Sequence, residues 1–105
     1  MAKVVNIRKV NGKRPKFDIY IGRLVSRTEF NWGSKWHNPF VPYTMGIKKC
    51  LEKYEEYIRK QIKENPEYFN LNELRGKVLG CWCKPKPCHG DILIKLMNEK
   101  LKNEA

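Results

Sequence analysis

The run Lys77–Cys83 most constrains the fold, because it is short and apolar and carries small residues at Gly80 and Cys81. Such a run predicts a buried, central β-strand. It is followed by a cysteine-rich turn and then by the amphipathic run Asp91–Lys102, which predicts a helix. A strand that turns at once into a helix is typical of α/β proteins, in which ligand sites gather at such turns.

Two further strands and one long helix are predicted upstream. The β-branched residues of Lys3–Lys9 favour an extended strand. Phe17–Arg23 alternates, which predicts a strand with Phe17, Ile19 and Ile21 on one face and Asp18 and Tyr20 on the other. Apolar residues at helical spacing predict a helix from an N-cap at Thr44 to Glu64, ended by Asn65-Pro66.

The connections add two expectations. Tyr68–Leu74 should form a short turn or single-turn helix closed by Gly76. The segment 24–43 is long for a loop, and its aromatic residues predict packing over the core or a sheet edge rather than disorder. We therefore expect a single α/β domain over residues 1–105, with a mixed sheet of about three to four strands packed with one long helix and a C-terminal helix.

Composition narrows the class of protein. No apolar run approaches the roughly 20 residues that cross a bilayer, and Met1–Val5 lacks the apolar core of a signal peptide. We therefore expect no membrane association and a cytoplasmic location. In that reducing compartment, the four cysteines point to thiol chemistry, metal binding or simple packing rather than to a disulfide framework. Cys50, beside the apolar stripe of the long helix, is expected to be a small buried residue.

Positive charge is concentrated in the N-terminal half of the chain. The formal net charge is +11, and residues 1–49 hold eleven Lys/Arg against only Asp18 and Glu29. A one-sided positive field attracts polyanions such as nucleic acid or phosphorylated ligands. A basic surface that serves solubility alone would give the same composition.

The turn between the last strand and the last helix has three interpretations. As a metal site, Cys81, Cys83, Cys88 and His89 supply the donor types of structural zinc, with His37 as a substitute ligand from elsewhere. The spacing argues against this reading, because one residue separates the first two ligands and the last two are adjacent. As a purely structural feature, the cysteines would fill tight space while His89 and Asp91 cap the helix.

The third interpretation places Cys88-His89-Gly90-Asp91 at a helix start, where free N–H groups and the helix dipole favour an anion. The same field favours a thiolate, so Cys88 would be a nucleophile and His89 a general acid or base. Asp91 is the third candidate catalytic residue, although an acid in the first turn also stabilises a helix by itself. Arg23, at the tip of the second strand, would clamp a phosphate or carboxylate ligand.

The chain resembles the uncharacterised family known as domain of unknown function 4326. The resemblance is carried by six segments spread over most of the chain: Val4–Ile7, Tyr20–Arg23, Asn38–Phe40, the helix around Tyr54, Leu74–Lys77 leading into Cys81-Trp82-Cys83, and Cys88–Asp91. It implies no established activity, but it implies that these motifs belong together. The segment between Arg23 and Asn38 is longer and more aromatic than the link that the resemblance leads us to expect.

Taken together, these observations favour a small protein that binds a nucleotide or nucleic acid at the Cys-His turn. The ligand-binding residues would be Gly22, Arg23, Asn38, Cys83, His89 and Gly90, and any catalysis would involve Cys88, His89 and Asp91. The alternative is a zinc-binding structural or interaction module that uses Cys81, Cys83, Cys88 and His89. The sequence specifies neither a reaction nor an oligomeric state.

Overall fold

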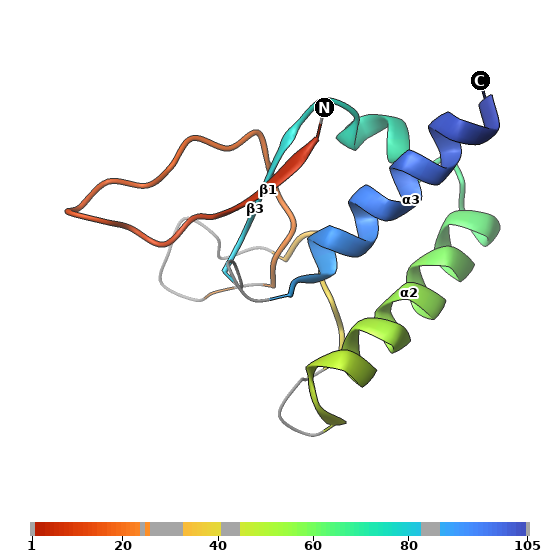
Figure 1. The fold of residues 1–105 in the computed structure, drawn as a ribbon, viewed down its shortest axis with the longest axis horizontal. Coiled ribbons are helices and arrows are strands. Elements are labelled where there is room, and N and C mark those ends of the chain that lie inside the picture. The colour runs from red at the N-terminus through yellow and green to blue at the C-terminus, as the bar shows by residue number, and fades with distance from the viewer. Residues whose placement is uncertain (1, 24, 26–32, 41–44, 83–86, 105) are drawn as a thin grey trace.

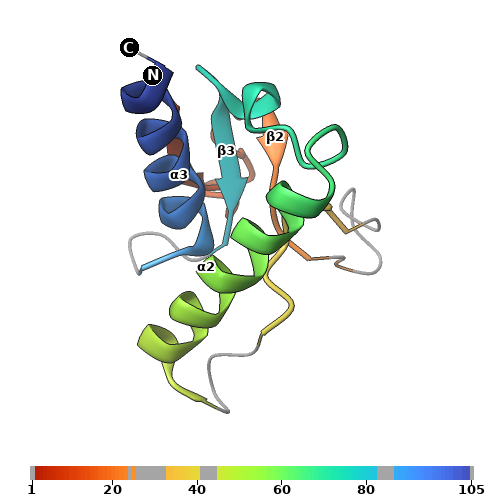
Figure 2. The same ribbon diagram turned by 90° about the vertical axis from the view of Figure 1, so that its right-hand side faces the viewer.

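The structure is a computed structural model, and it describes residues 2–23, 25, 33–40, 45–82 and 87–104, excluding the side chains of 101, 103 and 104. The elements run in the order β1 (Lys3–Asn6), β2 (Ile19–Tyr20), α2 (Ile47–Glu64), the 3-10 helix η1 (Leu71–Leu74), β3 (Val78–Cys81) and α3 (His89–Glu104). Two helices lie on one side of a small sheet (Figures 1 and 2). The predicted α/β class, the long helix and the C-terminal helix are confirmed.

The sheet has the strand order β1-β3-β2. The predicted apolar strand is therefore central, and Leu79, Gly80 and Cys81 are buried, as its apolar composition predicts. Val4 pairs with Leu79 and Ile19 pairs with the same residue from the other side. Both of these pairings are parallel, where we expected a mixed sheet.

The second strand is shorter than its alternating pattern predicted, and Phe17 does not share a face with Ile21. Phe17 precedes β2 and packs with Tyr20 and Ile7 on the face away from the helices, not with Ile21. The Asp18 carboxylate interrupts the pattern, because it accepts a hydrogen bond from the Val78 N–H at 2.8 Å. Tyr20, assigned to the polar face, is only 3% exposed and is buried in a cluster with Ile7, against which Phe17 packs.

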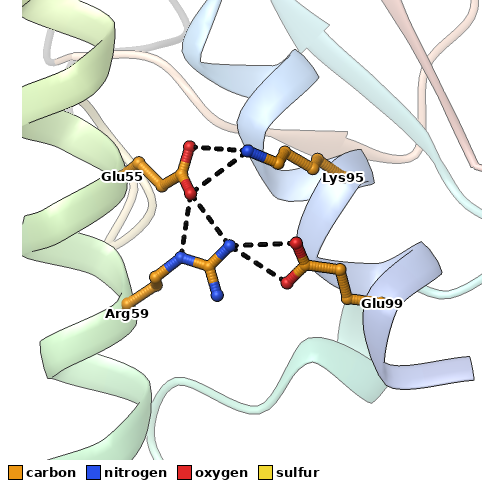
Figure 3. A network of polar contacts seen from close by, with 4 residues as sticks. All are labelled: Glu55, Arg59, Lys95 and Glu99. Carbon is orange, nitrogen blue, oxygen red and sulfur yellow. Dashed lines mark hydrogen bonds and ion pairs between the residues drawn. The ribbon is translucent and has the colours of Figure 1, made fainter. Parts of the chain in front are cut away.

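The two helices pack on the sheet through the main core. One buried core cluster contains Tyr54 and Ile58 of α2, Leu93 and Leu96 of α3, and Leu79 of the central strand. A polar network also links the helices: Glu55 and Arg59 of α2 contact Lys95 and Glu99 of α3 (Figure 3). These ion pairs are partly exposed, so each contributes at most about 1 kcal/mol.

The helix ends differ from prediction by a few residues. The N-cap of α2 is Gly46, whose φ of 82° suits glycine, so α2 begins at Ile47; the predicted cap, Thr44, lies outside the described residues. The C-cap is Asn65, as predicted. The helix α3 begins at His89, two residues before the predicted Asp91, because Cys88 takes the cap position.

The described part of the aromatic segment 24–43 packs against the core, as predicted. Trp36 is 2% exposed and meets Phe69 edge to face at 5.5 Å. Its carbonyl accepts a 2.7 Å hydrogen bond from the buried Tyr54 hydroxyl. The predictions for Phe30 and Trp32 fall outside the described residues.

No helix among the described residues is long and apolar enough to cross a membrane.

Candidate functional site

A cavity of about 240 Å³ lies at the edge of the sheet where β2 and β3 end and where α2 and α3 begin. In Figure 2 the arrow of β3 points toward the end of α3 that begins at His89. Ligands of α/β proteins bind beyond the carboxyl ends of parallel strands in this way. The cavity is lined by Tyr20, Gly22, Arg23, Val25, Asn38, Phe40, Ile47, Cys50, Leu51, Cys81, Trp82, Pro87, Cys88 and His89.

Most of the predicted site residues converge on this cavity. Gly22, Arg23, Asn38, Cys88 and His89 come from three separate segments of the chain and all line it. The lining does not include Gly90 or Asp91. Gly90 lies against the side chains of Val4 and Ile21, and Asp91 lines a separate depression along α3. Cys83, predicted to bind the ligand or, in the alternative, zinc, lies outside the described part of the chain.

Arg23 lines the cavity and also supports a turn of the backbone. Its Nε donates to the Asn38 carbonyl at 2.8 Å, and its Nη2 donates to the Phe40 carbonyl. Asn38 completes this turn, because its Oδ1 accepts from the Phe40 N–H at 2.9 Å. Its Nδ2 contacts the Cys50 sulfur at 3.3 Å, which fixes the turn to α2. Asn38 and Phe40 of the Asn-Pro-Phe triplet therefore form part of the cavity wall.

Gly22 is required for a close approach within the chain. A Cβ atom at this position would lie 2.4 Å from the Tyr20 hydroxyl oxygen. That hydroxyl donates to the Arg23 carbonyl at 2.5 Å and accepts from Trp82 Nε1 at 2.9 Å. Because residue 22 is a glycine, the Tyr20 side chain can pack against it. The Tyr20 hydroxyl then links Arg23, which follows β2, to Trp82, which follows β3.

His89 is buried, 7% exposed, and held in one orientation. Its Nε2 lies 2.7 Å from the Ile21 carbonyl oxygen. A carbonyl only accepts, so Nε2 carries the proton and Nδ1 is left as an acceptor. Burial lowers the pKa of His89, and the hydrogen bond to Ile21 only partly opposes this shift. The ring is therefore neutral near pH 7 and presents Nδ1 as a base.

Cys88 lies between this base and a second thiol. Its Sγ is 3.7 Å from His89 Nδ1 and 3.1 Å from the sulfur of Cys81, and it also accepts from the Gly90 N–H at 3.4 Å. A thiol at a helix start beside a neutral imidazole is the arrangement that activates cysteine nucleophiles. Cys81 and Cys88 are each only 1% exposed, so reagents reach them through the cavity.

Three N–H groups at the start of α3 make contacts within the chain. The Cys88 N–H donates to Asp91 Oδ2 at 3.1 Å, and the Asp91 N–H donates to the Cys88 carbonyl at 2.9 Å. The Gly90 N–H is directed at the Cys88 sulfur. A Cβ on Gly90 would lie 2.7 Å from Val4 Cγ2, so this glycine allows α3 to approach the sheet closely. Asp91 has the position and contacts of a capping acid.

Among the residues that the structure describes, no group of three or more His, Cys, Asp or Glu side chains is placed to hold a metal ion. Cys81, Cys88 and His89 lie together, but the zinc interpretation also requires Cys83, which is not described. The two sulfur atoms at 3.1 Å contact each other directly. His37 directs its Nδ1 to the Ser34 carbonyl at 2.7 Å.

Sequence reasoning missed the aromatic rim of the cavity. Trp82 is 38% exposed at the mouth, and the guanidinium carbon of Arg14 lies 5.4 Å from the centre of a Trp82 ring. Arg14 is further held by donation from Nη1 to the Ile7 carbonyl at 2.6 Å. The adjacency of aromatic and basic residues was visible in the sequence only for segment 24–43, since Trp82 and Arg14 are distant along the chain.

Arg14 belongs to a basic arm, which we define as residues 8–16. The arm projects from the sheet on the side away from the helices (Figure 1). It turns at Asn11 and Gly12, whose φ angles of 53° and 76° match the hairpin turn expected of an Asn-Gly pair. It has no acidic residue, and four of its cations are exposed: Arg8, Lys9, Lys13 and Lys16.

Comparison with known proteins gives a family without an assigned activity. The family model described as Domain of unknown function (DUF4326) matches residues 5–99. An uncharacterized 12.4 kDa protein from the nrdA-td intergenic region of Enterobacteria phage T4 is 34% identical over 99 residues, which cover 92% of this chain and 82% of the phage protein.

An uncharacterized protein from Acanthamoeba polyphaga mimivirus is 35% identical over 89 residues, which cover 75% of this chain and 65% of the mimivirus protein. This chain therefore spans somewhat less than two thirds of the mimivirus protein's length. No solved structure matches the chain significantly.

Proposed function

The chain belongs to the family described as domain of unknown function DUF4326, and we propose that it binds a nucleotide unit, free or within single-stranded nucleic acid. The base would enter the cavity beside Cys88 and His89, and the phosphates would lie along the basic arm. The observation that carries the proposal is the Arg14–Trp82 contact, which joins the cationic arm to the aromatic mouth of the cavity.

The size and lining of the cavity support a base as the inserted group. Sites for drug-sized ligands occupy roughly 300–1,000 Å³, and a cavity of about 240 Å³ therefore suits a smaller planar group. Tyr20, Phe40 and Trp82 contribute aromatic side chains to its lining. Stacking of a base on an aromatic ring typically contributes about 1–3 kcal/mol and tolerates any base.

The charges support a phosphate-bearing ligand outside the cavity. Because the N–H groups of Cys88, Gly90 and Asp91 are engaged within the chain, the helix start offers them to no phosphate. The exposed cations of the arm have no acid within the arm to neutralise them. They therefore provide the phosphate contacts in this proposal, in place of Arg23 and Gly90.

Fluorescence anisotropy with labelled single-stranded DNA and RNA oligonucleotides, and with a labelled nucleoside monophosphate, tests the proposal. The double variant Lys13→Gln/Lys16→Gln should weaken oligonucleotide binding and reduce the slope of log K against log salt by about 0.7 per cation removed. The matched control is Lys53→Gln/Lys60→Gln, which removes the same charge from the exposed face of α2. An equal loss in both double variants would indicate non-specific attraction to the net charge.

The cavity itself is tested by Ile47→Trp. Ile47 is 39% exposed at the rim, so a larger ring there can fill the mouth without disturbing the core. We expect binding to weaken at least about tenfold, which corresponds to about 1.4 kcal/mol. The control is Tyr68→Trp, at a 60% exposed position outside the cavity lining. Unchanged affinity of Ile47→Trp for both ligands would contradict a base in the cavity.

The Cys88–His89 geometry favours an extension of this proposal to catalysis. His89 Nδ1 would take the Cys88 thiol proton, and the sulfur would attack an electrophilic carbon of the bound nucleotide. Turnover of a candidate substrate should then be lost in Cys88→Ser and in His89→Gln, while both variants still bind it. Turnover that survives in Cys88→Ser would exclude this role.

A further inference from the structure

Two thiols from different elements meet in the core beside the cavity. Cys81 is the last residue of β3 and Cys88 immediately precedes α3, and their sulfur atoms are 3.1 Å apart. A disulfide has an S–S length of about 2.05 Å, so an approach of about 1 Å separates this thiol pair from a bond. Neither residue forms a disulfide bond with another described cysteine.

The surroundings distinguish the two sulfur atoms. Cys88 Sγ receives the Gly90 N–H and faces His89 Nδ1, which can accept its proton. The start of α3 also favours negative charge on this sulfur. Cys81, at the end of β3, contacts the Cys88 sulfur. Cys88 is therefore the thiol that reacts first, and Cys81 is placed to resolve the product.

We propose that Cys88 is a modification site for small hydroperoxides and that Cys81 resolves it to an internal disulfide. The Cys88 thiolate attacks one peroxide oxygen, the O–O bond breaks, and the departing oxygen leaves as water or alcohol with the proton that His89 held. Cys88 is then a sulfenic acid. The Cys81 sulfur attacks the Cys88 sulfur, the S–O bond breaks, and water leaves. The peroxide is reduced by two electrons and the two thiols are oxidised by two.

Burial makes the reaction selective for small oxidants. Each sulfur-bearing residue is only 1% exposed, yet both line the cavity, so hydrogen peroxide can reach Cys88 while bulky reagents are restricted. Cys50 is equally buried and lines the same cavity, but its sulfur contacts the Asn38 amide instead of a second thiol. Cys50 therefore serves as the internal control.

The test treats the reduced, folded full-length protein with a small excess of hydrogen peroxide and measures intact mass. We expect the wild type, Cys50→Ser and Cys83→Ser to lose the mass of two hydrogen atoms, and dithiothreitol to restore it. Cys81→Ser should form no disulfide, and its Cys88 should instead be trapped as a sulfenic acid by dimedone. The variant His89→Gln should react at least about tenfold more slowly, since positioned bases contribute factors of that order or more.

A wild-type measurement covers the case in which a cysteine variant fails to fold. After oxidation, the remaining thiols are alkylated under denaturing conditions and located by tandem mass spectrometry. Cys50 and Cys83 should be labelled as in untreated protein, and Cys81 and Cys88 should not. Loss of label from Cys83 in place of Cys81 would overturn the proposed pair. One tightly bound zinc per purified chain, with thiols inert to peroxide until it is removed, would also overturn the proposal.

Discussion

His89 connects three parts of the molecule through a single ring. Nε2 reaches the Ile21 carbonyl at the end of β2, Nδ1 faces Cys88, and the ring meets Tyr54 of α2 edge to face at 5.1 Å. Protonation would place a charge in this buried position and remove the acceptor that faces the thiol. The protonation state of one residue therefore affects both the stability of the fold and the chemistry of the cavity.

The pH dependence of stability follows from the lowered pKa of His89. The unfolded chain takes up a proton near pH 6.5 while the folded chain resists it, so stability is full above that pH and is lost as pH falls toward the folded pKa. Urea unfolding should show this loss as the pH falls below about 6.5, and His89→Gln should flatten it. An unchanged slope in His89→Gln would contradict a buried neutral imidazole.

At the scale of elements, the site depends on how closely the helices approach the sheet and the loops. Gly90 allows α3 to contact Val4 of β1, and Tyr54 of α2 binds the Trp36 carbonyl. The periodicity of the sequence predicted both helices and the central strand well, because burial of an apolar stripe dictates them. The periodicity could not predict where β2 begins, or that Phe17 packs on the other face of the sheet from Ile21. The hydrogen bond between Asp18 and Val78 joins residues that are far apart in the sequence, so no local pattern records it.

Substitution of Gly90 tests the close approach of α3 to the sheet. Gly90→Ala places a methyl group within 2.7 Å of Val4 Cγ2 and 2.9 Å of Ile21 Cδ1. Overpacking of this kind typically costs about 1–3 kcal/mol, despite the better helix propensity of alanine. Chemical denaturation measures the change, with Asn98→Ala on the exposed side of α3 as the control. A variant as stable as the wild type would show that α3 can shift freely.

Removal of one hydroxyl tests the attachment of the aromatic segment to α2. Tyr54→Phe deletes the donor to the Trp36 carbonyl in a fully buried position and keeps the ring. An unpaired buried carbonyl costs about 1–3 kcal/mol, and the free energy of unfolding should fall by that amount. Tyr57→Phe, on the same helix and only partly buried, is the control and should have little effect. Equal stability of both variants would contradict the contact.

At the scale of the whole molecule, the basic arm and the two helices extend from opposite sides of the sheet (Figure 1). The excess of positive charge in residues 1–49 and the convergence of three motifs at one sheet edge followed from the sequence and its resemblance. The roles of individual motif residues did not. Arg23, Asn38 and Asp91 bind backbone groups of this chain, a use that depends on turn geometry that no pattern of residue types records.

The neighbourhood of arm and cavity is also a property of the whole fold. Arg14 meets Trp82 only because the arm folds back onto Ile7 and because β1 and β3 pair in parallel register. Those contacts link residues that are far apart in sequence. In the proposed binding mode, the Arg14–Trp82 contact connects the arm to the cavity that the two cysteines line.

A nitrogen–proton NMR titration of the labelled protein with a nucleoside monophosphate, and then with a short single-stranded oligonucleotide, tests the central claim most directly. We predict saturable shifts at amides around the cavity, including Leu51, Trp82 and His89, with both ligands. The oligonucleotide should add shifts at Lys9 and Lys13 of the arm. Shifts confined to the arm, or none with either ligand, would contradict a nucleotide-binding cavity at the Cys-His turn.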